Sequence, residues 1–288
     1  MKKVILFGAS GHVGRKVAEE LARQHFELTV VIRNNAKAHY FKDIQAKIVN
    51  ADVLKPDALR GICHGQDVVI STLGKSVSPN DWSKPTFRQV DLEGNVNILN
   101  EAQKSGVKKF IYLSAFHAEK YPDLNYFAVH EQFSMILINS GIDYSVIKPP
   151  AIYSAFLDMI DLASKGRLVS IGSGEFKTNP IYEGDLAKII VDNIHQTNSI
   201  VEAGGKNIYS RIQMLEIIQQ NVNPANKIQK LPLKLVKMVL PVLSIINKNA
   251  YDKFAFFLKV MNTDTLAPQI GEQSFEEYIK DKIAFDHN

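Results

Sequence analysis

Short apolar runs alternate with segments of helical periodicity through the first half of the chain. The apolar runs are rich in valine and isoleucine and nearly continuous, which is typical of parallel strands that are covered on both faces. They predict six strands, at residues 3–7, 27–32, 46–50, 67–72, 109–113 and 143–147. Helical patterns occupy intervals between them, at residues 12–24, 55–63, 87–105 and 127–140. Alternating strands and helices predict an α/β fold with a doubly wound parallel sheet.

The regular alternation of predicted strands and helices ends after Pro149 and Pro150. Four helical segments follow, joined by loops, at residues 183–195, 211–221, 233–246 and 274–282. Because we find neither an internal repeat nor a low-complexity linker, we expect the second half to be a smaller, mainly helical lobe packed on the sheet. The predicted division is residues 1–150 for the sheet domain and residues 151–288 for the lobe.

Composition narrows the class of protein. The chain has 288 residues, of which 45% are hydrophobic and 22% charged, a balance that argues against disorder. The formal charge of +4 is spread along the chain, without the basic, aromatic-interleaved stripe expected of a nucleic-acid binder. The single cysteine, Cys63, excludes an internal disulfide and fits a reducing compartment. The apolar run at residues 4–7 is too short for a secretory signal, so we expect a soluble, cytoplasmic protein.

A glycine-rich turn follows the first predicted strand directly. Gly8 permits the tight turn from strand to helix, Gly11 lets the backbone approach a diphosphate, and Gly14 lets the helix pack close to the sheet. The amides at the helix N-terminus then face the anion. Because a strand precedes this pattern and a helix follows it, we predict a dinucleotide-binding turn made by Gly8, Ser10, Gly11, His12, Val13 and Gly14. The alternative is that the glycines serve only the turn.

The end of the second predicted strand favours NADP(H) over NAD(H). A carboxylate there binds the ribose 2′-hydroxyl in such folds, whereas an arginine accommodates a 2′-phosphate. This chain has Arg33 and Asn34 and no carboxylate, although Arg33 could equally be a solvated loop charge. Asp52 would receive the adenine amino group or would cap a helix ahead of Pro56. Further cofactor contacts are expected after the third and fourth strands, from Asp52, Val53, Thr72, Leu73 and Gly74.

These residues resemble the short-chain dehydrogenase/reductase superfamily. They look most like its atypical branch, which includes the NmrA-like proteins and NAD(P)H-dependent reductases or epimerase-like enzymes. Residues 8–14 match the atypical Gly-x-x-Gly-x-x-Gly pattern, and similar segments lie at residues 50–53, 67–74, 106–114, 140–149 and 179–187. The usual arginine before the proline is Lys148 here. The resemblance implies a Rossmann fold in which the nicotinamide is bordered by Pro149, Pro150 and Ile152.

The resemblance also implies a catalytic serine after the fifth strand and a Tyr-x-x-x-Lys motif on the next helix. Ser114 matches the serine and Tyr126 the tyrosine, but His130 stands where the family has lysine. That lysine binds the ribose hydroxyls and lowers the pKa of the tyrosine, which is the general acid. A largely neutral histidine would activate Tyr126 more weakly and in a pH-dependent way. The alternatives are that Tyr126 packs in the lobe interface and that His130 lies on the helix surface.

The leading hypothesis is an NADP(H)-dependent oxidoreductase that reduces a small organic acceptor such as a carbonyl, a quinone or a flavin. The second hypothesis is a non-catalytic NADP(H)-binding redox sensor of the NmrA-like type, which the histidine at position 130 favours. A sugar-nucleotide epimerase or dehydratase is a weaker third. We expect no metal, because the eight histidines lack metal-ligand spacing with a carboxylate partner.

Besides the substrate, we expect no nucleic-acid or membrane partner and a monomeric or homodimeric protein. One stretch bears on this expectation. Residues 231–248 are basic and amphipathic, with Lys234 and Lys237 beside an apolar stripe. We interpret the stripe as the packed face of a lobe helix. The alternative is that it rests on an anionic membrane or binds a partner.

Overall fold

The computed structural model describes residues 1–78 and 80–286 of the chain. The chain forms two compact units whose segments alternate along the sequence. The first unit contains Met1–Lys75, Lys84–Lys148 and Glu183–Val201. The second contains Ser76–Ser83, Pro149–Tyr182 and the chain from Glu202 onward. Residues 183–201 therefore belong to the first unit, although they follow position 150.

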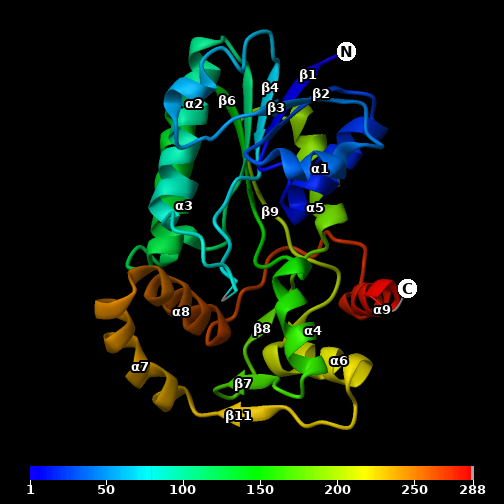
Figure 1. The fold of residues 1–288 in the computed structure, drawn as a ribbon, viewed down its shortest axis with the longest axis vertical. Helices are drawn as coiled ribbons and strands as arrows, with labels where there is room; N and C mark the ends of the chain where they lie inside the picture. Colours follow the sequence, from blue (N-terminus) through cyan, green and yellow to red (C-terminus); the bar gives the residue numbers. More distant parts are fainter. Residues whose placement is uncertain (79, 287–288) are drawn as a thin grey trace. The chain divides into compact units, whose positions relative to one another are not determined.

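A seven-stranded sheet forms the centre of the first unit, in the order β3-β2-β1-β4-β5-β6-β9 (Figure 1). From β3 to β6, neighbouring strands pair in parallel. This is the strand order of a Rossmann fold, with its switch point between β1 and β4. The predicted α/β class and its six strands are confirmed, and β9 is an edge strand that the apolar pattern did not reveal. The strands are β1 (Lys3–Phe7), β2 (Glu27–Ile32), β3 (Ala46–Asn50), β4 (Val68–Ser71), β5 (Lys109–Leu113), β6 (Asp143–Lys148) and β9 (Ser199–Glu202).

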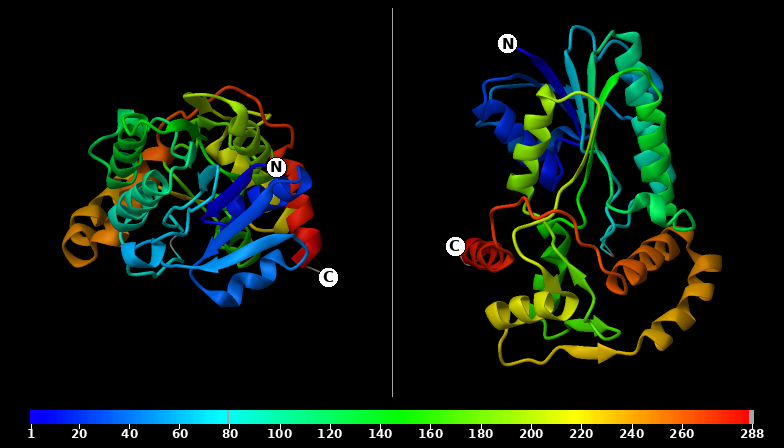
Figure 2. Two further views of the ribbon diagram at one scale, coloured as in Figure 1. Left: turned by 90° about the horizontal axis from the view of Figure 1, so that it is seen from above. Right: turned by 180° about the vertical axis from the view of Figure 1, so that it is seen from behind.

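Helices cover both faces of this sheet (Figure 2). On one face α1 (His12–Arg23) packs against α5 (Glu183–Asp192), and on the other lie α2 (Asn95–Lys104) and α3 (Asn125–Ile138). The strands β1, β2, β4, β5 and β6 are mostly buried between these two layers, as their composition predicts, whereas the predicted strand β3 is partly exposed along its whole length. Shorter helical segments of this unit are η1 (Asn35–Phe41), η2 (Pro56–Leu59), η3 (Arg88–Gly94), η4 (Ala118–Lys120) and η6 (Asn193–His195).

Two of the predicted helices differ from those observed. The helix expected at residues 55–63 is wrong, because only the 3₁₀ turn η2 forms there and Gly61, with a φ of +75°, takes the chain out of helical conformation. The helix expected at residues 87–105 is divided into the π-helical segment η3 and α2. Gly106 and Gly141 have φ values of +71° and +82°, and they follow the ends of α2 and α3.

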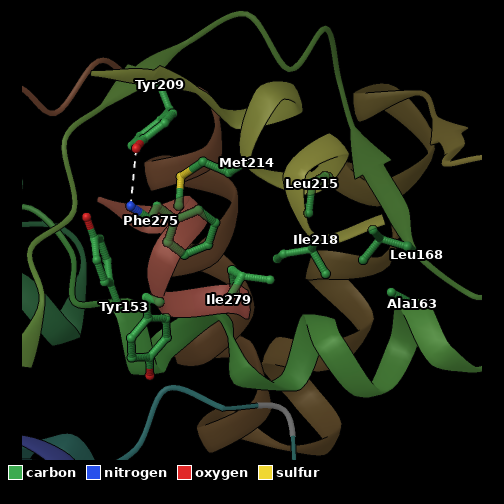
Figure 3. Close-up of a cluster of buried hydrophobic side chains, with 10 residues drawn as sticks. Tyr153, Ala163, Leu168, Tyr209, Met214, Leu215, Ile218, Phe275 and Ile279 are labelled. Atoms are coloured by element: carbon green, nitrogen blue, oxygen red, sulfur yellow. Dashed lines mark hydrogen bonds between the residues drawn. The ribbon is translucent and has the colours of Figure 1, made fainter. Parts of the chain in front are cut away.

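The second unit combines helices with two small two-stranded sheets. β8 pairs with β10 in antiparallel orientation, and β7 pairs with β11 in parallel. Its apolar core gathers side chains from four of its helical segments, with Tyr153, Met214, Ile218, Phe275 and Ile279 among its members (Figure 3). The elements are η5 (Tyr153–Phe156), α4 (Leu157–Ser164), β7 (Val169–Ile171), β8 (Lys177–Thr178), β10 (Tyr209–Ser210), α6 (Arg211–Val222), β11 (Gln229–Leu231), α7 (Leu233–Ile246), α8 (Lys248–Met261) and α9 (Phe275–Asp286).

The helix α7 corrects the interpretation of its apolar stripe as a packed face. All residues of α7 are described, and among them only Val236 is buried. Six large apolar side chains of α7 are exposed: Leu235, Met238, Val239, Val242, Ile245 and Ile246. Within residues 1–78 and 80–286, the structure contains no helix whose length and apolar character would let it cross a membrane.

A buried carboxylate, that of Glu20, forms hydrogen bonds at the C-terminal end of α1. Glu20 accepts hydrogen bonds from the Arg23 guanidinium at 2.8 and 2.5 Å and from the Gln24 amide at 2.7 Å. The hydrogen bond from Arg23 is the main cause that lowers the pKa of Glu20, and it outweighs the opposing effect of burial. The ionised form of Glu20 is therefore the form that stabilises the folded chain.

Replacing Glu20 should destabilise the protein in a pH-dependent way. Because the pKa of Glu20 is lower in the folded than in the unfolded chain, its contribution is present above about pH 5 and is lost as the pH falls through the folded-state value. We expect Glu20→Gln to reduce the free energy of unfolding by about 1 kcal/mol near neutral pH, and the difference to shrink in acid. Urea unfolding of both proteins at several pH values measures it.

The neighbouring glutamate provides the control. Glu19 pairs with Lys16 at 2.6 Å, but both side chains are substantially exposed. Glu19→Gln should therefore change the unfolding free energy by less than about 0.5 kcal/mol at any pH. Equal effects of the two substitutions would contradict the assignment of the buried carboxylate.

Candidate active site

The turn after β1 is pressed against the carboxyl end of β4. Gly8 has a φ of +75°, a conformation that residues with a Cβ atom rarely adopt. A Cβ atom there would lie 2.6 Å from both the backbone nitrogen of Leu73 and the carbonyl carbon of Thr72. The N–H of Thr72 donates to the Phe7 carbonyl at 3.0 Å, and its hydroxyl donates to the same oxygen at 3.2 Å. The turn therefore packs directly against the backbone of Thr72 and Leu73, while their expected contact with a cofactor stays a prediction.

The other two glycines of the turn meet different constraints. A Cβ atom at Gly14 would overlap the Gly8 carbonyl oxygen and lie 2.7 Å from the Cα of Ala9, so glycine is needed for α1 to approach the turn. At Gly11, the nearest described atom that a Cβ would meet is the Gly8 carbonyl oxygen, at 3.3 Å. Packing within the chain therefore excludes a Cβ atom at position 14, whereas at position 11 a Cβ atom would meet only one close contact. A close ligand at position 11 would supply the missing reason for glycine there.

The first turn of α1 is left open toward that position. Gly11 is the N-cap residue, and within the described chain no side chain forms a capping hydrogen bond there. Gly11 and His12 are exposed, and the first turn of α1 carries no acidic residue. A helix start without a side-chain cap, together with the helix dipole, favours an anion there. The local geometry fits a bound diphosphate.

Basic side chains lie near the end of β2. Arg33 follows β2 directly and is exposed. The guanidinium of Arg15, on α1, lies 4.5 Å from the ring centroid of Tyr40 and 3.2 Å from Nδ1 of His12. Arg15 follows Gly14 immediately, but the sequence analysis did not identify it, because the glycine spacing carries no information about this side chain. Two guanidinium groups, on Arg15 and Arg33, are therefore available to a phosphate or an adenine ring.

Several predicted contact residues also have structural partners. The Asn34 side chain accepts from the Ala36 amide at 2.9 Å and caps η1. Asp52 accepts from the Leu54 amide at 3.1 Å, whereas the N-cap of η2 is Lys55, so the alternative that Asp52 caps a helix ahead of Pro56 is wrong. The adenine contact of Asp52 stays a prediction.

A chain of buried polar groups runs from β5 to η3. The Tyr112 hydroxyl and Nδ1 of His130 form a hydrogen bond of 2.6 Å. On the other side of the imidazole, Nε2 lies 3.3 Å from Oδ1 of Asp91. Tyr112 and Asp91 are fully buried, and His130 is only 4% exposed. The alternative that His130 is a surface residue of the helix is therefore wrong.

Backbone groups hold Asp91 in place. Its two carboxylate oxygens accept from the Lys75 amide at 3.3 and 3.1 Å. Its carbonyl oxygen accepts from the Asn95 amide at 2.8 Å, and Asn95 accepts from the Ser71 hydroxyl at 2.6 Å. The π-helical turn of η3 carries Asp91 into this buried position. Asp91 was missed at the sequence level, because an acidic residue in a helical pattern normally faces solvent.

The three predicted catalytic residues lie in one neighbourhood. The ring centroids of Tyr126 and His130 are 4.6 Å apart, and Tyr126 is half-buried. Ser114 is linked to the same helix, because its hydroxyl lies 3.1 Å from that of Ser134, which donates to the His130 carbonyl at 2.8 Å. The family motif positions thus converge, although His130 is turned toward Tyr112 and Asp91.

The environment of Tyr126 raises the pKa of its hydroxyl, whereas the family lysine would lower it. Burial, together with the charge of Asp91, raises the pKa of the Tyr126 hydroxyl. Burial and Asp91 also raise the pKa of Tyr112, while a hydrogen bond with Ser114 acts in the other direction. Activation of Tyr126 toward its phenolate form is therefore not what this environment provides. Tyr126 stays protonated at neutral pH and can act as a proton donor.

The residues directly after β6, Pro149–Tyr182, belong to the second unit. Lys148 ends β6 within the first unit, where its ammonium lies 3.1 Å from Glu119 and 3.4 Å from Glu131. Ile152, in the second unit, forms an isolated bridge with Ile181. The expected nicotinamide contacts of Pro149, Pro150 and Ile152 stay predictions.

The structure also bears on nucleophilic chemistry at Cys63 and on metal binding. Burial raises the pKa of the Cys63 thiol to about 12, which makes it a poor nucleophile. Over the described ranges 1–78 and 80–286, no three histidine, cysteine, aspartate or glutamate side chains cluster as metal ligands would.

The comparisons agree with this geometry. The chain matches the model of the NAD(P)H-binding family over residues 8–197, and it belongs to that family. It is 27% identical to the chloroplastic divinyl chlorophyllide a 8-vinyl-reductase of Arabidopsis thaliana, over 97% of this chain and 74% of that protein. It is 21% identical to the photosystem II assembly factor Ycf39 of Trieres chinensis, over 97% and 87% of the two chains.

Solved structures show the same fold. The UDP-glucose 4-epimerase of Thermotoga maritima has a TM-score of 0.77 and 15% identity, over 99% of this chain and 98% of that one. The NADPH-dependent quinone oxidoreductase QOR2 of Escherichia coli, in complex with NADPH, has a TM-score of 0.70 and 18% identity, over 97% and 99%. The resemblance to the atypical short-chain dehydrogenase/reductases is confirmed, and such folds occur with either nicotinamide nucleotide.

The buried tyrosine–histidine contact predicts a specific loss of stability. Tyr112→Phe removes the hydroxyl and leaves Nδ1 of His130 buried without it, which should cost about 1–3 kcal/mol of unfolding free energy. Tyr144→Phe, on the neighbouring strand and only half-buried, is the matched control and should cost less than about 0.5 kcal/mol. Denaturant unfolding compares the two. Indistinguishable values would show that the contact contributes nothing.

Proposed function

We propose that the protein is an NADP(H)-dependent reductase of a small organic acceptor. The observation that carries the proposal is the glycine turn, which leaves room at Gly11 above an uncapped helix start. Arg33 directly follows β2, where an arginine accommodates a 2′-phosphate in such folds, and this supports NADP(H) over NAD(H). The relative named a vinyl-reductase supports the direction of the reaction.

The residues present fit such a cofactor. The open amides of the first turn of α1 would hold the diphosphate, and Thr72 and Leu73 would border the cofactor at the end of β4. Arg33 would pair with the 2′-phosphate through two parallel hydrogen bonds. Arg15, already stacked on Tyr40, would add positive charge on the same side of the site. When bound, the nicotinamide would supply a hydride to the acceptor.

Tyr126 is the proposed proton donor. Reduction of a carbonyl or quinone adds a hydride to the acceptor and needs a proton for its oxygen, so the donor must be protonated at the outset. Tyr126 meets that requirement at neutral pH, as an ordinary tyrosine does, while burial and Asp91 raise its pKa and make its hydroxyl a weaker acid. Ser114, anchored by Ser134, would give the acceptor oxygen a second hydrogen bond. An epimerase or dehydratase would need the tyrosine as a base, which the same environment disfavours.

The acceptor is best sought among conjugated small molecules. A carbonyl, a quinone or a flavin would each accept the hydride and the proton from Tyr126. A conjugated carbon–carbon double bond joins this set, because the plant relative is named for reducing a vinyl group. Oxidation of NADPH in the presence of each acceptor class identifies which one the protein uses.

The second candidate is an NADP(H)-binding protein without turnover. The observation that favours it is the inward position of His130, whose two ring nitrogens face Tyr112 and Asp91. In that position the imidazole does not take the place of a ribose-binding ammonium. The relatives named as photosystem II assembly factors are consistent with such a role. NADPH binding without NADPH oxidation by any acceptor class would favour this candidate.

Charge reversal at Arg33 tests the choice of cofactor. Arg33→Glu should weaken NADPH binding by about tenfold to a hundredfold, because a charge-assisted hydrogen bond is replaced by repulsion. NADH binding should change by less than about threefold. Isothermal titration calorimetry measures both. Arg60→Glu, at an exposed arginine paired with Asp57, is the control and should leave both affinities unchanged. Equal losses for the two nucleotides at Arg33 would refute 2′-phosphate recognition.

Removal of the Tyr126 hydroxyl tests the chemistry. Tyr126→Phe should lower kcat by about 10²- to 10⁴-fold with the acceptor that the screen identifies, while the Kd for NADPH stays within about twofold. Tyr121→Phe removes a hydroxyl just before α3 and should leave kcat nearly unchanged. Full activity of Tyr126→Phe would assign the proton donor elsewhere.

A further inference from the structure

The helix α7 presents apolar side chains outward as well as inward. Ile245 is 87% exposed, Ile246 76% and Met238 72%. Val236, on the opposite side, is the buried residue, and α7 packs along α8. Large exposed apolar patches are uncommon on soluble proteins and mark surfaces that contact something else.

The exposed residues form one continuous stripe. Their positions are separated by three and four residues, which places them on a single face of an α-helix. The stripe consists of Leu235, Met238, Val239, Val242, Ile245 and Ile246. Lys234 and Lys237 are exposed and lie along one edge of this face by the same geometry.

The charge around the stripe has one sign. Residues 217–251 contain five lysines and not a single aspartate or glutamate. All five lysines are exposed: Lys227, Lys230, Lys234, Lys237 and Lys248. Such a segment is complementary to an anionic surface, and the absence of acidic residues removes the local ion pairs that would neutralise it.

We propose that α7 lies flat in the interface of an anionic lipid bilayer. The apolar stripe would enter the boundary between headgroups and acyl chains, and the lysines would contact the anionic headgroups. With 14 residues, α7 is about 21 Å long and is therefore too short to span the hydrocarbon layer. This inference reverses the expectation of no membrane partner, and it does not depend on the proposed enzymatic activity.

A lipid surface fits the stripe better than a protein partner. The cores of protein interfaces are enriched in aromatic residues and arginine, whereas α7 contains neither. Its large exposed apolar residues are aliphatic apart from Met238, and its cations are all lysines. A second copy of this chain would bring the same positive charge against itself.

Vesicle flotation of the full chain tests the proposal, without nucleotide present. We expect the protein to float with vesicles of phosphatidylcholine containing about one third phosphatidylglycerol, and to bind pure phosphatidylcholine at least about tenfold more weakly. Ile245→Glu should lower partition into the anionic vesicles by about tenfold or more. It removes an apolar side chain that would enter the bilayer, and it adds a negative charge that the anionic headgroups repel. The double variant Lys234→Glu, Lys237→Glu should weaken binding similarly.

Matched controls make the outcome decisive. Ile270→Glu changes an isoleucine of the same unit that is 45% exposed and lies outside α7, and it should leave flotation unchanged. Circular dichroism should show that every variant keeps the wild-type fold. The proposal is overturned if the protein does not float with anionic vesicles, or if Ile245→Glu floats as well as wild type. It is also overturned if sedimentation equilibrium shows a dimer that Ile245→Glu dissociates while vesicles are not bound.

Discussion

The first unit depends on backbone packed directly against backbone where β1 turns into α1. Gly8 touches the backbone of Thr72 and Leu73, and Gly14 touches Gly8 in turn. With side chains excluded from both contacts, the helix start is held at the switch point between β1 and β4. The same contacts fix the direction in which the open amides of α1 point. A ligand site made largely of backbone is rigid because no rotamer has to be ordered when the ligand binds.

Beyond the sheet switch, a second constraint is the burial of a carboxylate beside a histidine. Isolated charges are expensive to bury, and the Asp91 carboxylate accepts from the backbone amide of Lys75 and lies 3.3 Å from Nε2 of His130. This arrangement explains how the chain keeps a family-like helix without the family lysine. The lysine position has changed from a cation directed at the cofactor to an internal link between β5 and η3. Chemistry that needs a protonated tyrosine is compatible with that change.

The sequence was sufficient to predict the central sheet and its first turn, but not the buried polar contacts of the first unit. Continuous apolar runs predicted the six inner strands, and the glycine spacing predicted the turn, because both patterns follow from sterics local to the chain. The strand β9, the contact of Arg15 with Tyr40 and the burial of Asp91 depend on segments distant in sequence. A helical pattern cannot reveal a π-helical turn, since one extra residue rotates the following side chains to another face. The inward orientation of His130 could not be predicted, because it depends on Tyr112, which lies on another element.

The return of residues 183–201 to the first unit carries a consequence for how the chain folds during synthesis. The helix α5 packs against α1, and β9 completes the sheet, yet both are synthesised only after residues 149–182 of the other unit. A nascent chain ending near residue 150 exposes the apolar side of α1 that α5 later covers. Folding of the nucleotide-binding unit is thereby delayed until part of its neighbour exists, and a cut at the apparent domain boundary yields two incomplete fragments.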